Sequence, residues 1–466
     1  MLGMGNMRQW LMNISLVGGW FPAAAFAVVA VLSVILLVSA AVSKRDGRIL
    51  ATVLPIGVAA VSGMIGYVVA WLLSDVFVVF GVGLGSRVMS WVAAGFAIAG
   101  FAIVHIVLSR GMMRVAAAIL TVFAILAAAI GIDQSYGEYA TIGSLFGEDS
   151  YSQADLTGLA KRKDLITVAQ WRKQAANGTI RNIPANGTVN KIDIPATKSQ
   201  FEARKALVYL PPAALADSKR KPALPVVLML SGQPGSPGRV FQAGGIQTMM
   251  DGYAKTHDGL APIVIAADQL GADSHNTLCV DSKVYGNALT YLTQDVVDWV
   301  KTNLPAAQDA KDWAIAGFSQ GATCSLQIGV NHPDLFGTMI PTDSEIKPTN
   351  GGRQEMIDRF FDGDTTAYEN QVPVNAIRNH APTHQMLIIG AGEKDTTSIR
   401  NVKTIAPVAA KAGMRVAAVE SSGNAHDWHA VQDVLRYGLA VFGHDTGLDG
   451  ANPNLSDYPN LKRITI

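Results

Sequence analysis

The first third of the chain is dominated by long apolar stretches that contain no Asp, Glu, Lys or Arg. These stretches occupy residues 21–43, 49–74, 88–109 and 115–132. A helix needs roughly 20 apolar residues to cross the hydrocarbon core of a bilayer, a length that three of them exceed and the fourth approaches. A helix in the core of a soluble protein rarely stays uncharged for so long. The pattern therefore predicts a transmembrane domain of four helices over residues 1–132.

The charges between the apolar stretches predict how the chain crosses the cell membrane. The loops after the first and the third stretch are basic, with Lys44, Arg45, Arg48, Arg110 and Arg114. Basic loops stay on the cytoplasmic side, so the N-terminus and everything after residue 132 are expected on the extracytoplasmic side. A cleaved signal peptide is the alternative for the first stretch, but its basic residues would precede the apolar run instead of following it.

The pattern of apolar and polar positions changes after the fourth stretch. Gly, Ser, Tyr, Asp and Glu dominate the start of residues 133–185, which we interpret as a membrane-proximal linker. Over 186–445, short apolar runs alternate with segments of helical periodicity, and a C-terminal tail follows at 446–466. A run such as 225–230 is apolar throughout, which is typical of a strand buried on both faces. Strands that alternate with helices predict a mostly parallel sheet with helices on both faces.

Composition and charge narrow the class of protein. Apolar residues make up 49% and charged residues 16% of the chain, as a membrane domain requires. The formal net charge is +1, which indicates no nucleic-acid partner. The two cysteines form no Cys-x-x-Cys pair and no cluster with histidine, so no metal site is predicted. The chemistry described next needs no cofactor.

One stretch of the 186–445 region carries the pattern of a nucleophilic serine. An apolar run, Ala314–Ala316, leads into Gly317-Phe-Ser-Gln-Gly321, and a helix-compatible segment follows at Ala322–Val330. A serine at a sharp strand-to-helix turn sits in strained backbone and needs small neighbours, which the glycines provide. The chain has 45 glycines, so the weight of this motif comes from the strand and helix that flank it. The pattern predicts Ser319 as the nucleophile.

A serine hydroxyl needs a base, and the base needs an acid that orients it. On α/β-hydrolase sheets these residues follow the chain order Ser, acid, His. Asp395 comes just after the predicted strand 385–390, and Glu393 is the alternative acid. His426 lies in a Gly-containing loop after the predicted strand 415–420, and His429, one helical turn later, is the alternative histidine.

The oxyanion that forms when serine attacks an ester needs two preorganised N–H donors. The residue after the nucleophile, Gln320, supplies one in this type of site. The second is expected from the loop after the strand 225–230, which places Gly232 and Gln233 in the oxyanion hole. The alternative is that this Gly- and Pro-rich loop is only a turn.

Residues 186–445 resemble the esterase D and mycolyltransferase-type branch of the α/β-hydrolase superfamily. The resemblance is carried by Val208-Tyr-Leu-Pro-Pro212, Gly317-Phe-Ser-Gln-Gly321, Asn331-His-Pro-Asp-Leu-Phe336, Gly392-Glu-Lys-Asp395 and Gly423-Asn-Ala-His-Asp-Trp428. It implies an α/β-hydrolase fold with Ser319 as nucleophile, Asp395 as acid and His426 as base. The chain departs from the family where Gly423-Asn-Ala-His426 replaces the commoner Gly-Gly-His. Four spans followed by such a domain are similar to membrane-anchored esterase-like proteins of actinobacteria.

The two cysteines fit the expected topology. Cys324 lies in the first turns of the helix after Ser319, and Cys279 precedes a helix that packs nearby in this fold. A disulfide between them would persist outside the cytoplasm. The alternative is two buried free thiols, each a small hydrophobic side chain.

Together these observations predict a membrane-anchored extracytoplasmic serine esterase. It would act on a lipid or cell-envelope ester, with the membrane as its other partner, and hydrolyse or transfer the acyl group. A cell-envelope acyltransferase uses the same residues and differs only in its acceptor. A catalytically silent binding or scaffold protein is the third possibility, against which the presence of Ser319, Asp395 and His426 counts.

Overall fold

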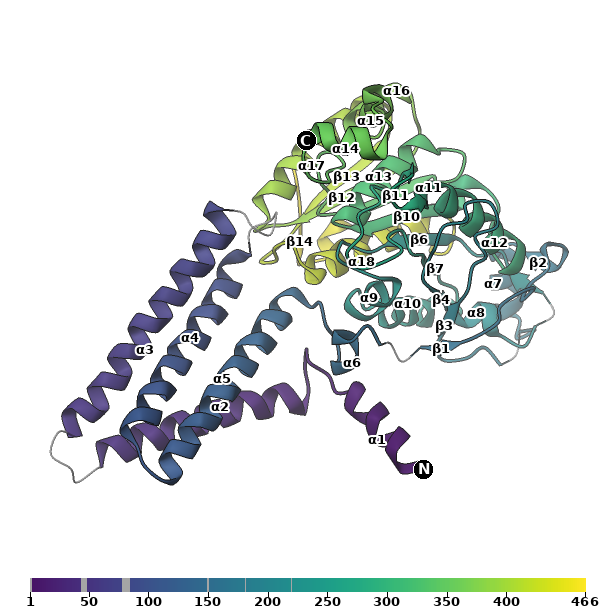
Figure 1. Ribbon diagram of the computed structural model, residues 1–466. Coiled ribbons are helices and arrows are strands. Elements are labelled where there is room, and N and C mark those ends of the chain that lie inside the picture. The colour runs from purple at the N-terminus through teal and green to yellow at the C-terminus, as the bar shows by residue number, and fades with distance from the viewer. Residues whose placement is uncertain (1, 43–47, 78–83, 149–150, 181, 219) are drawn as a thin grey trace. The chain divides into compact units, whose positions relative to one another are not determined.

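The computed structural model describes residues 2–42, 48–77, 84–148, 151–180, 182–218 and 220–466 (Figure 1). Two of the basic loop residues used to predict orientation, Lys44 and Arg45, lie outside the described residues. The chain forms two compact units. The first is Met1–Glu148 with the loop residues Ala425–Asp427, and the second is Asp149–Asn424 with Trp428–Ile466.

The first unit is helical. Its helices are α1 (Leu2–Met12), α2 (Trp20–Ala41), α3 (Arg48–Trp71) with a π-helical turn (Leu72–Val76), α4 (Gly85–Leu108), α5 (Met112–Tyr136) and α6 (Ile142–Leu145). Within the described residues, four helices are long and apolar enough to cross a membrane: Trp20–Ala41, Thr52–Val76, Gly85–Leu108 and Met112–Tyr136. They match the four predicted stretches, and the last continues four residues beyond the predicted end at residue 132.

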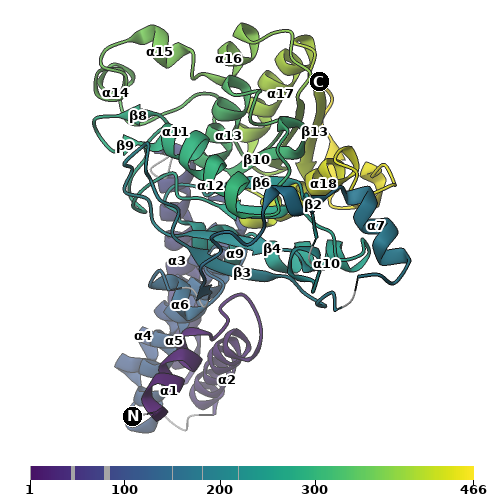
Figure 2. The ribbon, with the colours of Figure 1, turned by 90° about the vertical axis from the view of Figure 1, so that its right-hand side faces the viewer.

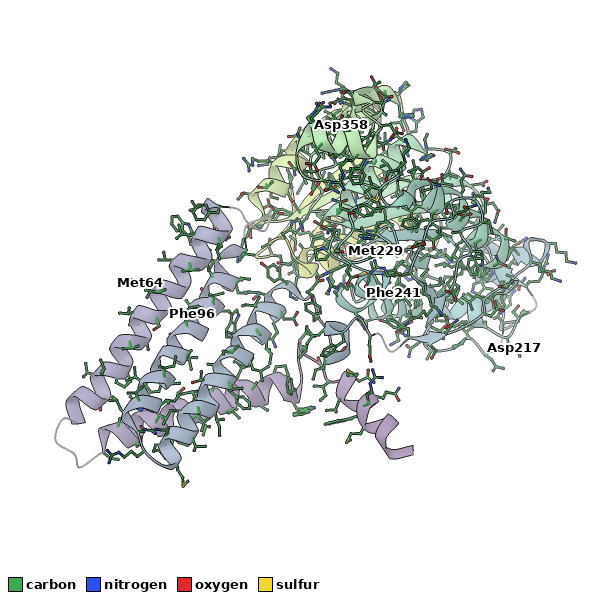
Figure 3. All side chains as sticks on the ribbon, in the orientation of Figure 1. Met64, Phe96, Asp217, Met229, Phe241 and Asp358 are labelled. Carbon is green, nitrogen blue, oxygen red and sulfur yellow. A yellow bond between two sulfur atoms is a disulfide. The ribbon has the colours of Figure 1, made fainter. Side chains whose placement is uncertain are left out.

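Small residues let α3, α4 and α5 pack closely side by side (Figure 1). A Cβ on Gly66 of α3 would lie 2.8 Å from the ring of Phe96 on α4, the side chain that Figure 3 labels. A Cβ on Gly131 of α5 would lie 2.3 Å from the ring of Trp91 on α4. In a bilayer the hydrophobic effect does not drive helices together, and close packing at small residues is a main source of helix association there. The outer surface of these helices carries large apolar side chains, such as the exposed Met64.

The second unit is built on a ten-stranded sheet with the order β1-β3-β4-β7-β6-β10-β11-β12-β13-β14. The strands from β7 to β13 in this order are parallel, whereas β4 is antiparallel to both its neighbours and β14 is antiparallel to β13. The strands are β1 (Ser152–Gln153), β3 (Thr188–Ile192), β4 (Ala206–Leu210), β6 (Val226–Leu230), β7 (Ile263–Ala266), β10 (Trp313–Phe318), β11 (Thr338–Thr342), β12 (Met386–Gly392), β13 (Arg415–Ser421) and β14 (Leu461–Arg463).

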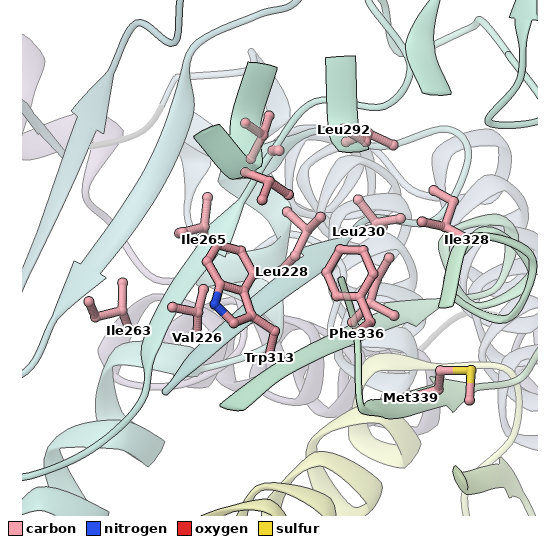
Figure 4. Packing of buried hydrophobic residues seen from close by; sticks show 14 of the residues in the cluster. Val226, Leu228, Leu230, Ile263, Ile265, Leu292, Trp313, Ile328, Phe336 and Met339 are labelled. Carbon is pink, nitrogen blue, oxygen red and sulfur yellow. The ribbon is translucent and has the colours of Figure 1, made fainter. Parts of the chain in front are cut away.

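Helices cover both faces of this sheet, because alternate side chains of its central strands enter two different cores. Leu228 of β6 and Ile315 of β10 belong to the core under α12, α13 and α17, part of which Figure 4 shows. Val227 and Ala314 belong to the core under α9, α10 and α18. The covering helices are α9 (Pro237–Ala243), α10 (Ile246–Lys255), α12 (Val296–Asn303), α13 (Gln320–Asn331), α17 (Thr396–Lys411) and α18 (Trp428–Asp445). This architecture confirms the predicted α/β-hydrolase fold.

A smaller lobe has its own core. Figure 2 shows α14 (Arg353–Phe360), α15 (Thr365–Glu369) and the hairpin of β8 (Asp281–Ser282) with β9 (Gly286–Asn287) gathered at one end of the second unit. Their apolar side chains, including Leu278, Val280, Met356 and Tyr368, form one buried cluster. Cys279 stands between Leu278 and Val280 in the sequence, but its side chain packs in the larger core of the second unit. The lobe is therefore joined to the main domain close to Cys279. Other short elements of the second unit are α7 (Val168–Ala176), α8 (Pro212–Leu215), α11 (Ala288–Thr290), α16 (Pro373–Asn379), β2 (Leu165–Ile166) and β5 (Lys221–Pro222).

The second unit extends beyond the predicted catalytic boundaries of 186 and 445. In the predicted linker, β1 pairs with β3, and the indole of Trp171 on α7 is fully buried and donates to the Asp258 carbonyl at 3.2 Å. In the predicted tail, β14 adds an edge strand to β13. Strands of two or three residues leave no readable apolar run in a sequence, which is why both segments were predicted to lie outside the domain.

Candidate active site

Ser319 lies at the sharp turn between β10 and α13, in the left-handed region with φ 55° and ψ −116°. A non-glycine residue is held there only when the surrounding structure demands it. A Cβ on Gly317 would lie 2.2 Å from the Gly321 carbonyl oxygen, and one on Gly321 would lie 2.3 Å from the Ser231 carbonyl oxygen. The two glycines of the motif are therefore required by close backbone contacts on both sides of the half-buried serine.

The predicted oxyanion loop lies next to the serine. A Cβ on Gly232, which follows β6, would lie 3.5 Å from the Cβ of Ser319. Gln320 begins α13, so its N–H belongs to the first turn, where helix N–H groups have no helical partner. The side chain of Gln233 points elsewhere and donates to the Ser274 carbonyl at 3.2 Å. The site residue Gln233 can thus contribute only its backbone to an oxyanion hole.

A buried glutamine that sequence reasoning missed, Gln269, connects the loop after β6 with the start of α13. The Gln269 amide nitrogen donates to the Ser231 carbonyl at 2.7 Å and to the Gln320 side-chain oxygen at 3.2 Å. Gln269 is fully buried. Its signal in the sequence was its place just after the apolar run 262–267, at the carboxyl end of a parallel strand, where α/β proteins collect functional residues.

An ion pair between Arg204 and Asp268 also supports the predicted oxyanion loop that follows β6. Arg204 donates to both carboxylate oxygens of the fully buried Asp268, at 3.0 and 2.8 Å, and to the Gly235 carbonyl at 2.9 Å. Burial opposes the charge on Arg204, but its hydrogen bonds to Asp268 outweigh this effect and raise its pKa. Because Gly235 packs on the Gly232 carbonyl, this pair holds the loop in place.

Asp395 is positioned by the start of α17. Its Oδ1 accepts hydrogen bonds from the N–H groups of Thr397 at 3.2 Å and Ser398 at 3.0 Å, and the residue is 8% exposed. A ligand atom of His426, in the loop between β13 and α18, lies within 4.8 Å of carboxylate oxygens from both Asp395 and Asp343. The structure thus brings the predicted acid and the predicted base together, and it adds a second acid.

Sequence reasoning missed Asp343. It follows β11 directly, is fully buried and has a φ of 55°. Its Oδ1 accepts from the N–H of Gly392 at 2.9 Å, and the preceding residue, Thr342, accepts from the N–H of Ser319 at 3.0 Å. The rule that selected Asp395, an acid at the carboxyl end of a late strand, also applies to Asp343 and would have found it.

The two alternative residues have other places. Glu393 pairs with Lys462 of β14 at 2.9 Å and accepts from the N–H of Gly423 at 2.7 Å. The hydrogen bond from Lys462, then that from Gly423, lowers the pKa of Glu393. Glu393 therefore ties the loop that carries His426 to the sheet edge. His429 lies half-buried in the first turn of α18, and the cluster of ligand atoms around Asp395 does not include it.

The departure from the Gly-Gly-His pattern has a structural role. The Asn424 amide donates to the Ser421 hydroxyl at 2.8 Å and to Asp433 at 3.2 Å, and its carbonyl accepts from the N–H of Lys394 at 2.8 Å. Asp427 accepts from the N–H of Ala425 at 2.8 Å. The side chain of Asn424 thus adds two hydrogen bonds that glycine lacks, and they fix the loop just before His426.

Cys279 and Cys324 form a disulfide, which confirms the predicted bond. Cys324 lies in the second turn of α13, and Gln320 in the first turn donates to Asn276 at 3.2 Å. The segment around Cys279 is therefore held against the start of the helix that follows Ser319 by both a covalent and a polar link.

The comparisons with known proteins agree with this fold. The family model described as putative esterase matches residues 198–438. An uncharacterised protein of Corynebacterium glutamicum is 32% identical over 333 residues, which cover 70% of this chain and 74% of that protein.

Solved structures resemble this chain more distantly. An S-formylglutathione hydrolase from Agrobacterium tumefaciens is 16% identical with a TM-score of 0.46, and covers 57% of this chain and 98% of its own. MPT51 of Mycobacterium tuberculosis is 13% identical with a TM-score of 0.39, and covers 55% and 98%. A ferulic acid esterase from Anaeromyces mucronatus is 19% identical with a TM-score of 0.42, and covers 56% and 93%. Likenesses of this size carry no information on a substrate.

Proposed function

This chain belongs to the putative esterase family, and we propose that it is a membrane-anchored serine hydrolase that acts through an acyl-enzyme on Ser319. The observation that carries the proposal is the position of Ser319, held with positive φ at the β10–α13 turn beside the Gly232 loop. The proximity of Asp395 to His426 supports it, since a serine nucleophile needs an oriented base.

In the proposed reaction, His426 takes the hydroxyl proton as Ser319 Oγ bonds to the ester carbonyl carbon. Asp395 stabilises the imidazolium that forms. The negative charge moves to the carbonyl oxygen, where the N–H of Gln320 and one from Gly232 or Gln233 receive it. The carbon–oxygen bond of the ester then breaks, and His426 returns the proton to the departing alkoxide. Water, or a hydroxyl of an acceptor, attacks the acyl-enzyme by the same steps in reverse.

We further propose that the catalytic unit faces the extracytoplasmic side and acts on lipid or cell-envelope esters. Four helices able to cross a membrane keep the enzyme beside amphiphilic substrates. Two observations support the side: the basic loop residues predict it, and a disulfide persists in an oxidising compartment. Water as the acceptor makes the protein a hydrolase, and a sugar hydroxyl makes it an acyltransferase.

The test uses the full chain in lipid nanodiscs. We expect the wild type to hydrolyse short-chain p-nitrophenyl esters and to be labelled at Ser319 by a fluorophosphonate, and Ser319→Ala to lose both properties. Equal residual rates in the two proteins would refute the serine mechanism. If the folded wild type neither turns over nor is labelled, the protein is a binding protein. For an active wild type, product analysis with an added sugar acceptor distinguishes hydrolysis from acyl transfer.

A further inference from the structure

Two buried carboxylates, instead of one, lie beside the base of the proposed triad. We propose that Asp343 is a second orienting acid, which shares the imidazole of His426 with Asp395. The inference rests on the proposed function, since it concerns how the base of that reaction is held and charged.

The first support is the placement of Asp343 between the nucleophile and the acid loop. Its backbone N–H donates to the Gly390 carbonyl at 2.9 Å, and its Oδ1 accepts from Gly392. The segment that carries it is also bound to the elbow helix, where the Thr323 hydroxyl accepts from the N–H of Glu345 at 3.0 Å. Asp343 is therefore fixed by hydrogen bonds to the strand β12 segment that leads to Asp395.

The second support is the charge arrangement. Ligand atoms of Asp343, Asp395 and His426 all lie within 4.8 Å of one another, and both acids are more than nine-tenths buried. Two carboxylates at this separation repel each other while the imidazole is neutral. When His426 takes the serine proton, the imidazolium lies within 4.8 Å of the carboxyl groups of both Asp343 and Asp395. Asp343 thus stabilises the imidazolium form of His426 more than the neutral imidazole of the resting enzyme. Stabilisation that is stronger during the reaction than before it is what accelerates a reaction.

The alternative is that Asp343 only braces the Gly392 backbone. Asparagine separates the two roles, because its side-chain oxygen can still accept from Gly392 while its charge is gone. Asparagine also tolerates a positive φ as well as aspartate does. Asp343→Asn, Asp395→Asn and the double variant therefore remove charge with little change of shape.

The experiment measures kcat and KM for a p-nitrophenyl ester with these three variants in nanodiscs. Loss of the only orienting acid of a triad lowers kcat by about 10⁴-fold. We expect the double variant to reach roughly this loss, whereas Asp395→Asn falls about 10²-fold and Asp343→Asn about 10-fold, with KM nearly unchanged. Asp298→Asn, an exposed change on α12, is the matched control and should keep wild-type kcat.

The pH dependence of kcat/KM separates the two roles, because the loss of a residue that only braces the Gly392 backbone would not shift its acid limb. The other titratable groups close to His426 along the chain, Asp427 and His429, are unchanged in these variants. Removing the Asp343 charge makes the imidazole easier to deprotonate, so the acid limb of kcat/KM should move to lower pH.

The inference would be overturned by an Asp395→Asn variant as inactive as the double variant, or by an Asp343→Asn variant with unchanged kcat and acid limb. A fall in kcat without any movement of the limb would also assign Asp343 to bracing alone. Failure of the proposed function is recognised separately, since Ser319→Ala would then retain the wild-type rate.

Discussion

Replacing Gly321 with alanine tests whether close backbone contact, and not only the serine itself, makes the elbow work. The added Cβ would lie 2.3 Å from the Ser231 carbonyl oxygen and 2.5 Å from that of Leu230. Ordinary contact begins near 3.4 Å, so α13 and the oxyanion loop must separate by about 1 Å. Neither neighbour is a flexible side chain that can turn away.

A 1 Å displacement of catalytic groups costs about 10²-fold in rate. Overpacking of a well-packed site adds about 1–3 kcal/mol of destabilisation. We therefore expect Gly321→Ala to lower kcat/KM for a p-nitrophenyl ester about 100-fold and to lower Tm by a few degrees. The assay is ester turnover by the full chain in nanodiscs, with thermal unfolding of the same samples.

The matched control is Gly252→Ala on α10, where an added Cβ meets nothing within 4 Å. This change should leave turnover as it is and stabilise the protein by about 0.5–1 kcal/mol, because alanine loses less backbone freedom than glycine in a helix. A Gly321→Ala variant with kcat/KM within twofold of wild type and an unchanged Tm would refute the steric reasoning.

Three further outcomes are expected. Gln269→Leu removes the buried donor to the Ser231 carbonyl and should lower kcat about 10-fold at similar KM; unchanged kinetics would show that the loop is held without it. Replacing Cys279 and Cys324 by serine should cost about 4 kcal/mol in denaturant unfolding, given the separation of 45 residues, and wild type isolated without reductant should give no reaction with a thiol reagent. Asp295 should stabilise the fold in a pH-dependent way: burial opposes its charge, but hydrogen bonds from Ser199 and Lys198 prevail and lower its pKa. Its contribution is complete above the unfolded value near 4 and is lost as pH falls through the lower folded value, so Asp295→Asn should reduce Tm at pH 7 but much less at pH 3.

Features that depend on a short stretch of chain were predictable. The length of each uncharged stretch located the four long helices to within a few residues. Gly317 and Gly321 identified the turn at Ser319, since close backbone packing excludes any larger residue at both positions. The alternation of buried runs with helical periodicity identified the α/β class.

Features that depend on contacts between different segments of the chain were not predictable from the sequence. Trp171 lies in a basic, polar stretch, and only the Asp258 carbonyl and the neighbouring core make it a buried residue of the second unit. The short strand β14 exists because β13 offers a free edge. From the sequence, Asn424 in place of glycine only made the loop conformation less certain. In the structure its side chain donates a hydrogen bond to Asp433.

The sequence by itself determined the four long apolar helices, the sheet-and-helix class and the turn that presents Ser319, because each of these depends on the residue types of one short stretch. The tertiary structure added the second acid that meets the base. Strand order places β11 beside both β10 and β12, so that Asp343 lies next to the loop of Asp395 although 52 residues separate them. Local sequence encodes which segments become strands, but the pairing of those strands is set by how the whole core packs, and that pairing brings the second carboxylate to His426.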